Sequence, residues 1–161
     1  MTDPVATEST VREAGTGDVE GVATAVEALL VELGGRCPER SVLETEARAL
    51  LDDPAGGSVL IAEADGEIVG LLSASWQRAI HVPGVYATIQ DLWVDGAWRS
   101  RGVGAELVEA IASQARTRGV SRLEVGLPRE TFAAIASTES FYERNGFEHL
   151  GPRMRRLLDE P

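Results

Sequence analysis

The sequence predicts a mixed α/β (α+β) fold in which helices flank one central mixed sheet. An apolar strand, a long amphipathic helix and a second strand follow one another between residues 86 and 127. A right-handed crossover of this kind places its two strands parallel. Upstream, Asp65-Gly66 separates two β-rich segments, which predicts an antiparallel hairpin. The length suits one domain over residues 1–161, with residues 1–9 as a flexible tail.

The first part of the chain is predicted to contain a short strand and two helices. Residues 10–14 form the strand, and Thr16-Gly17-Asp18 supplies a helix-capping signal after it. The helix that follows is indicated by apolar residues at helical spacing: Val19, Val22, Val26, Leu29, Leu30 and Leu33. It ends at Gly34-Gly35. The capping-box spacing from Ser41 to Glu44 predicts a second helix that runs to Asp52.

The middle of the chain is predicted to form three strands and the long helix. The hairpin pairs residues 58–64 with residues 67–77, and a loop of residues 78–85 follows it. The next strand covers residues 86–94, and the amphipathic helix covers residues 102–118.

The C-terminal part is predicted to begin with a strand over residues 122–127. A short helix then begins at Ser137 and stops at Asn145-Gly146, because glycine readily adopts the left-handed conformation that ends a helix. The remaining apolar residues predict a closing pair of short strands, residues 147–150 and 154–158.

Composition and charge restrict the classes of function. Fifteen basic residues against 26 acidic residues give a formal net charge of −11, which opposes nonspecific binding to nucleic acid or to anionic membranes. No apolar run approaches the roughly 18 residues of a membrane span, and no secretory signal is visible. Cys37 is the one cysteine, so no intrachain disulfide can form. We expect a cytoplasmic protein, and no cluster of metal-ligand residues is visible.

The segment between the strand 86–94 and the long helix is predicted to bind phosphate. It reads Arg99-Ser100-Arg101-Gly102-Val103-Gly104, and its glycines let backbone N–H groups approach an anion closely. The helix N-terminus adds unpaired donors and about half a positive charge. Arg99 and Arg101 add full charges beside it.

Two other kinds of phosphate loop do not fit this segment. A dinucleotide-binding fold needs a third glycine where this chain has Leu107, and needs its glycines directly at the strand end. A P-loop needs Gly-Lys-Ser/Thr, which is absent. A loop whose glycines serve only turn geometry, and whose arginines serve only solubility, is the remaining alternative.

A second motif lies downstream and reads Phe141-Tyr142-Glu143-Arg144-Asn145-Gly146-Phe147. Together the two motifs resemble, in kind and in order, those of the GNAT superfamily of acyl-CoA-dependent N-acyltransferases. The resemblance extends over residues 58–158. It implies a GNAT-like fold, acetyl-CoA as cosubstrate and a primary amine as the acceptor.

The resemblance also implies where CoA binds. The strand ending at Val94 and the strand 122–127 would splay apart, and the pantetheine arm would pair with the backbone exposed between them. Trp93 and Val94 would contact the thioester end, and the amides of residues 101–105 would contact the pyrophosphate. The implied cofactor-binding residues are Trp93, Val94, Arg99, Ser100, Arg101, Gly102, Val103, Gly104 and Ala105.

The catalytic groups follow from the same resemblance. Tyr142 matches a family tyrosine whose hydroxyl lies near the thioester sulfur and can protonate the departing thiolate. The alternative for Tyr142 is a buried tyrosine bonded to a backbone carbonyl. A backbone N–H near Val94 could polarise the thioester carbonyl. Candidates for the general base are Asp91 and Glu124, on opposite strands, and the loop residue His81.

The sequence departs from the family pattern at two positions. Ile135 stands where many members have an asparagine that contacts the CoA arm, and Gly96 stands where relatives often have proline. Two functions therefore remain: an N-acetyltransferase that transfers the acetyl group directly in a ternary complex, or a CoA-binding regulatory module with weak or no turnover. The acceptor, a small-molecule or peptide amine, has no motif of its own, and a homodimer is compatible with the family.

Overall fold

The computed structural model describes residues 7–158, so residues 1–6 of the predicted tail lie outside the described part, and residues 7–9 have no regular structure. The chain divides into two compact units, the first ending at Val125 and the second beginning at Gly126. The first unit contains the sheet and three helices, and the second contains one short helix.

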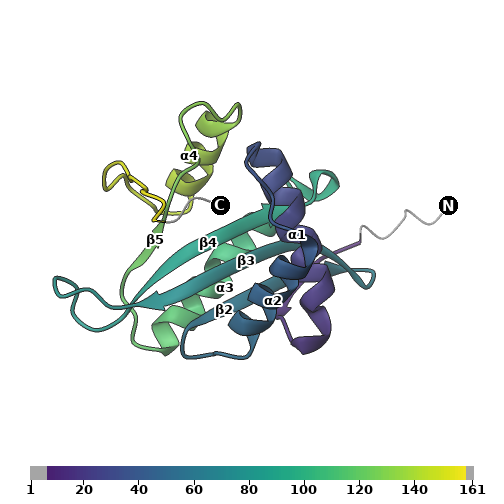
Figure 1. Cartoon of the computed structure of the whole chain (residues 1–161), viewed down its shortest axis with the longest axis horizontal. Helices are drawn as coiled ribbons and strands as arrows, with labels where there is room; N and C mark the ends of the chain where they lie inside the picture. The colour runs from purple at the N-terminus through teal and green to yellow at the C-terminus, as the bar shows by residue number, and fades with distance from the viewer. Residues whose placement is uncertain (1–6, 159–161) are drawn as a thin grey trace. The chain divides into compact units, whose positions relative to one another are not determined.

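The first unit is built on a five-stranded sheet in the order β1-β2-β3-β4-β5 (Figure 1). Neighbouring strands are antiparallel except β4 and β5, whose parallel pairing confirms the prediction from the strand–helix–strand pattern. The strands are β1 Thr10–Glu13, β2 Gly57–Ala64, β3 Glu67–Gln77, β4 Tyr86–Val94 and β5 Leu123–Val125. Asp65 and Gly66 have φ angles of 50° and 78°, the paired positive values of the tight turn predicted for Asp-Gly.

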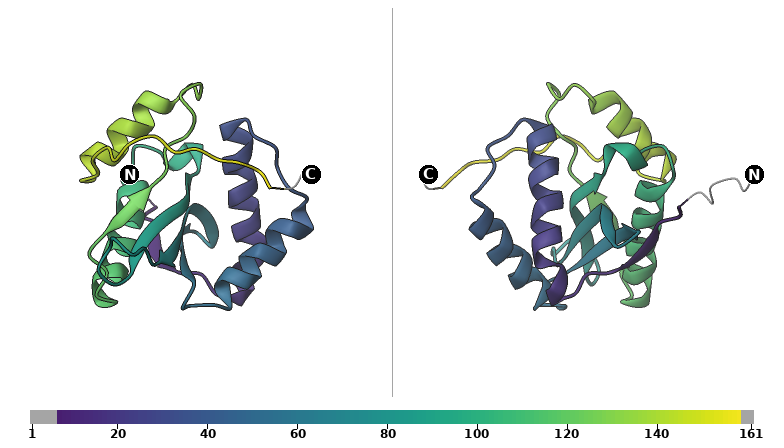
Figure 2. Two further views of the ribbon diagram at one scale, coloured as in Figure 1. Left: turned by 60° about the vertical axis from the view of Figure 1, so that its left-hand side comes forward. Right: turned by 90° about the vertical axis from the view of Figure 1, so that its right-hand side faces the viewer.

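Helices cover both faces of this sheet (Figure 2). On one face lie α1 (Val19–Leu33) and α2 (Arg40–Leu51), and on the other lies α3 (Val103–Thr117). The apolar cluster on the α1 side contains Val22, Ala25, Val59, Ile61 and Leu71. The cluster on the α3 side contains Ala87, Ala115 and Val120.

Local signals explain where the first two helices start and stop. α1 follows a 3₁₀ turn, η1 (Thr16–Asp18), and ends because Gly34 adopts a φ of 71° and its N–H donates to the carbonyl of Val31. The capping box predicted from Ser41 does not form. Glu39 occupies the capping position instead, its extended backbone starts α2 one residue earlier, and no side chain bonds the helix start.

The second unit contains α4 (Ile135–Arg144), which begins two residues before the predicted Ser137. The Ser137 hydroxyl donates to the carbonyl of Ala134, so it does not cap the helix. Gly146, with a φ of 87°, ends the helix as predicted.

The predicted closing strands, residues 147–150 and 154–158, are wrong, because this segment has no regular structure. Two short strands are stable only when they bury an apolar face. Here the large apolar side chains are exposed: Leu150, Met154, Leu157 and Leu158. Gly151-Pro152 also separates the two halves of the segment, with a φ of 133° at Gly151.

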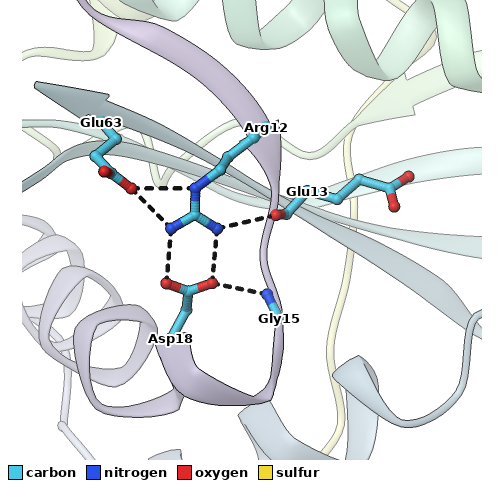
Figure 3. A network of polar contacts seen from close by, with 5 residues as sticks. All are labelled: Arg12, Glu13, Gly15, Asp18 and Glu63. Atoms are coloured by element: carbon cyan, nitrogen blue, oxygen red, sulfur yellow. Dashed lines mark hydrogen bonds and ion pairs between the residues drawn. The ribbon is translucent and has the colours of Figure 1, made fainter. Parts of the chain in front are cut away.

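Arg12 joins β1, η1 and β2 through its whole guanidinium group (Figure 3). Nε and Nη2 donate to Glu63 Oε2 over 3.1 and 2.7 Å, and Nη1 and Nη2 donate to the Asp18 carboxylate over 2.8 and 2.9 Å. Nη1 also donates to the carbonyl of Glu13, and Asp18 accepts from the N–H of Gly15. The bonds from Arg12 hold the pKa of Asp18 below its ordinary value. This network fixes the chain at the start of α1.

Replacing Arg12 with glutamine should lower the free energy of unfolding at pH 7 by about 1–2 kcal/mol, because two carboxylates lose their partner. The 46% exposure of the Arg12 side chain keeps the effect this small. The folded-state pKa of Asp18 is lowered, so the contribution is present above its unfolded pKa of about 4 and is lost as pH falls through the folded value.

Thermal denaturation across pH checks this prediction. The difference in melting temperature between wild type and Arg12→Gln should shrink below about pH 4. Arg116→Gln is a matched control, because its ion pair with Glu109 is exposed on both sides and should contribute little. A difference that does not change with pH would contradict the role given to Asp18.

Candidate active site

The candidate site lies on the C-terminal half of β4, where the strand carries a one-residue bulge. Ser73 and Ala74 are adjacent on β3, but their partners on β4, Asp91 and Ile89, are separated by Gln90. An extra residue of this kind reverses the alternation of side chains along the rest of the strand.

Because of the bulge, Asp91 and Trp93 face the α1 side of the sheet. Asp91 lies opposite Ser73 and accepts a hydrogen bond from its hydroxyl. Trp93 lies opposite Leu71 and packs against the apolar cluster on the α1 side. Before the bulge, Ala87 faces α3, so regular alternation would have turned Asp91 and Trp93 toward α3 as well.

Only part of the β4 edge that faces β5 is paired with that strand. β5 ends at Val125, which pairs with Ile89. Within the first unit, residues 90–94 therefore have no strand partner on this edge. β5 is shorter than the predicted strand 122–127, and all three of its residues pair with residues 87–89 of β4. The splaying of the two strands stays a prediction.

The hydrogen-bond ladder shows which backbone groups face the open edge. The N–H of Asp95 donates to the carbonyl of Val69 over 2.9 Å, and in an antiparallel pair every second residue bonds the same neighbour. The backbone of Trp93 thus faces β3, and the N–H and C=O of Leu92 and Val94 face the open edge. The predicted contacts of Trp93 and Val94 with the thioester end stay predictions, and the open edge adds Leu92 as a further candidate.

β4 leads into a turn that ends, among the described residues, with unbonded backbone N–H groups at the start of α3. Asp95 Oδ1 accepts from the N–H of Ala97 over 2.9 Å and starts a 3₁₀ turn, η2 (Gly96–Trp98). Ser100 (φ 60°) and Gly102 (φ 88°) then adopt the left-handed conformation just before α3. Among residues 7–158, no acceptor bonds the N–H groups of residues 101–105. Free donors at a helix N-terminus are the kind of backbone groups that can bind an anion.

The two arginines of this turn have different surroundings. Arg99 donates from Nε to the carbonyl of Val94 over 3.0 Å and from Nη2 to Glu32 on α1. Its charge is therefore paired, and it ties the strand end to α1. Arg101 stacks on the ring of Trp98 at 4.3 Å and takes part in no ion pair within the described residues. Arg101 is thus the arginine with charge available for an anion.

Asp91 and Glu124 both lie on the α1 face, but they differ in whether a cation is paired with the carboxylate. Burial raises the pKa of Asp91, and the bond from Ser73 opposes this rise. Among residues 7–158, no cation pairs with Asp91. Glu124, which shares the face because it pairs with Thr88, forms an ion pair of 2.7 Å with Arg122. The third candidate base, His81, lies on an exposed loop.

Tyr142 belongs to α4 in the second unit and is 8% exposed. Its ring meets Phe141 and Phe147 edge to face, with centroids 5.1 and 5.3 Å apart. Burial raises the pKa of Tyr142 to about 12, and no hydrogen bond contributes to the shift. The backbone-carbonyl partner considered for its hydroxyl is absent from the described residues. The phenol keeps its proton at neutral pH.

Two further observations concern what the described residues lack. No helix in residues 7–158 has the length and apolar character to cross a membrane. Within the same range, no group of three or more histidine, cysteine or acidic side chains is placed to hold a metal ion.

A bulged strand with an open edge runs into a helix start whose N–H donors have no acceptor among the described residues, an arrangement that could hold an extended ligand that carries phosphate. The family model "Acetyltransferase (GNAT) family" matches residues 26–147, and the chain belongs to this family. It is 30% identical over 95 residues to an IAA acetyltransferase of Azospirillum brasilense. That match covers 58% of this chain and only 60% of the relative.

Solved structures confirm the predicted fold. A possible acetyltransferase from Clostridium difficile 630 superposes with a TM-score of 0.78 at 21% identity, over 94% of this chain and 99% of that chain. An aminoglycoside N-acetyltransferase in complex with CoA also gives 0.78, at 16% identity, over 97% and 98% of the two chains. At these identities the likeness concerns the fold.

Replacing Ser73 with alanine should raise the pKa of Asp91 further, because the serine bond stabilises the carboxylate and opposes burial. Titration of the carboxyl carbon by NMR measures this pKa in the protein alone. Ser58→Ala is a matched control, because Ser58 pairs with Ala74 and faces the opposite side of the sheet. A pKa that falls or stays constant in Ser73→Ala would contradict the assignment.

Proposed function

We propose that this protein is an N-acetyltransferase that transfers the acetyl group of acetyl-CoA to a primary amine within a ternary complex. The open edge of β4, which continues into the unbonded N–H groups of residues 101–105, is the observation that carries the proposal. Membership of the GNAT family and likeness to a CoA-bound acetyltransferase support it. We also propose that the two units act as one domain, because the family model spans residues on both sides of Val125.

Acetyl-CoA fits two adjoining backbone features, the open edge of β4 and the free N–H groups of residues 101–105. The pyrophosphate would accept from the N–H groups of residues 101–105, with Arg101 adding charge. The pantetheine arm carries amides and would extend the sheet along the open edge, bonding the backbone of Leu92 and Val94. Both contacts use the main chain, so most side chains of the turn are free to vary.

The transfer requires one bond to form and one to break. The neutral amine nitrogen attacks the thioester carbonyl, and a backbone N–H near Val94 on the open edge stabilises the oxyanion that forms. The C–S bond then breaks, and the proton lost by the amine passes to Asp91 or to a water held by it. The Tyr142 hydroxyl protonates the departing thiolate and is restored from solvent. The role of Tyr142 rests on its place in the family signature and on its protonated state.

The two arginines should contribute differently to CoA affinity. Arg101→Gln is expected to weaken binding by about tenfold at low salt and by less at high salt, because the charge it removes is unpaired. Arg99→Gln should weaken binding with little dependence on salt, because Glu32 already neutralises that charge. Calorimetry at two salt concentrations measures both effects. Equal salt dependence in the two variants would contradict the conclusion that the charge of Arg101 is available to CoA and that of Arg99 is not.

Turnover tests the function itself. Incubation with acetyl-CoA and a pooled set of amines should release thiol and give acetylated products detectable by mass. Tyr142→Phe should lower kcat by about 10²-fold with little change in CoA affinity. CoA binding without turnover on any amine would instead support the alternative, a CoA-binding module of the same fold. A wild type that does not bind CoA would overturn both the acetyltransferase and the CoA-binding module.

A further inference from the structure

The α1 face of the sheet changes character along β3. Around Leu71 it is apolar and packed by α1, but Ser73, Ser75 and Gln77 follow at alternate positions and share that face. Thr88 pairs with Ser75, and Glu124 pairs with Thr88, so the polar surface continues across β4 and β5. We call this surface the polar floor; it consists of Ser73, Ser75, Gln77, Thr88, Asp91 and Glu124.

The polar floor is partly open to solvent. Ser73 and Thr88 are buried at 4% and 7% exposure, whereas Ser75, Gln77 and Glu124 are half-buried. A sheet face that is covered by apolar packing does not need such residues, because burying polar groups is costly without partners. This part of the face is therefore built to meet water or a polar ligand.

The hydrogen bonds within the floor leave particular groups unused. Thr88 Oγ1 donates to Gln77 Oε1 over 2.7 Å, which orients the amide and leaves its NH₂ group without an acceptor among the described residues. Ser75 has no hydrogen-bond partner in the same range, and neither does the second carboxylate oxygen of Asp91. The floor thus offers the Asp91 carboxylate at one end and the Gln77 amide donors at the other, with Ser75 and Glu124 level with each other between them.

We propose that the polar floor selects the acceptor, and that the acceptor is a hydrophilic amine. Its ammonium would lie at Asp91, which has no cation partner among the described residues, and oxygen atoms further along it would accept from Ser75 and Gln77. Ser73 and Gln77 are four residues apart on an extended strand, so the floor is roughly 13 Å long. The inference rests on the proposed function and deepens it by naming the chemical class of the acceptor.

Two sources share this chemistry, the hydroxyls of an amino sugar and the carbonyls of a peptide with a free N-terminus. An alkyl or aromatic amine of similar size lacks these oxygens. It would leave the Gln77 amide and the Ser75 hydroxyl without partners after displacing their water, which disfavours binding. Gln77 and Ser75 are therefore specificity-determining residues, distinct from the groups that move protons.

Steady-state kinetics with three acceptors tests the inference: glucosamine, the tripeptide Ala-Gly-Gly and cyclohexylamine. We expect kcat/KM to be about tenfold or more higher for at least one oxygenated amine than for cyclohexylamine. The oxygenated amine with the higher kcat/KM shows whether the acceptor is an amino sugar or a peptide with a free N-terminus. Gln77→Leu and Ser75→Val should reduce this ratio mainly by raising KM for the oxygenated amine, with KM for acetyl-CoA unchanged.

Ser58→Val is the matched control, because it makes the same change on the opposite face of the sheet and should leave the ratio as it is. A wild type that prefers cyclohexylamine, or a ratio unchanged in both floor variants, would overturn the inference while the proposed function stands. Absence of thiol release with every amine, with CoA still bound, would instead overturn the proposed function and the inference with it.

Discussion

The bulge at Gln90 sets both the side chains and the backbone groups that β4 presents. The same single-residue shift turns Asp91 toward Ser73 and moves the backbone of Leu92 and Val94 to the edge where β5 has already ended. A regular strand would turn the carboxylate toward α3 and leave the other set of backbone groups on the edge. The proposed chemistry therefore depends on a register shift that β3 and β4 maintain together.

The two halves of the site use different kinds of recognition. On the side of the turn, the groups proposed to bind the ligand are backbone N–H donors, and side chains act mainly as supports: Arg99 ties the strand end to Glu32, and Asp95 starts η2. On the α1 face, recognition depends on side chains of the polar floor. Since backbone donors tolerate side-chain substitution, changes to the polar floor would alter the proposed acceptor contacts and leave the proposed cosubstrate contacts as they are.

The sequence was sufficient where local chemistry decides the structure. Asp65-Gly66 predicted the hairpin, and the predicted bounds of β4 match the observed ones. Both depend on adjacent residues, which determine turn geometry and the alternation of side chains. The failures involve distant partners. The closing strands found no apolar face to bury. The backbone of Leu92 reaches the open edge because of a bulge that arises from pairing with β3, and Arg99 pairs with Glu32, which is 67 residues away. Neither feature can be predicted from adjacent residues.

The surroundings of the two carboxylates favour Asp91 as the base. A general base must gain a proton during the reaction, so its anionic form should not be strongly stabilised by a cation. Glu124 is paired with Arg122 at 2.7 Å, which works against proton uptake. Asp91 has no cation partner among the described residues, and burial raises its pKa and so its basicity. Ser73 limits that rise with one hydrogen bond, which favours the ionised carboxylate and orients it, while its other oxygen has no partner among the described residues.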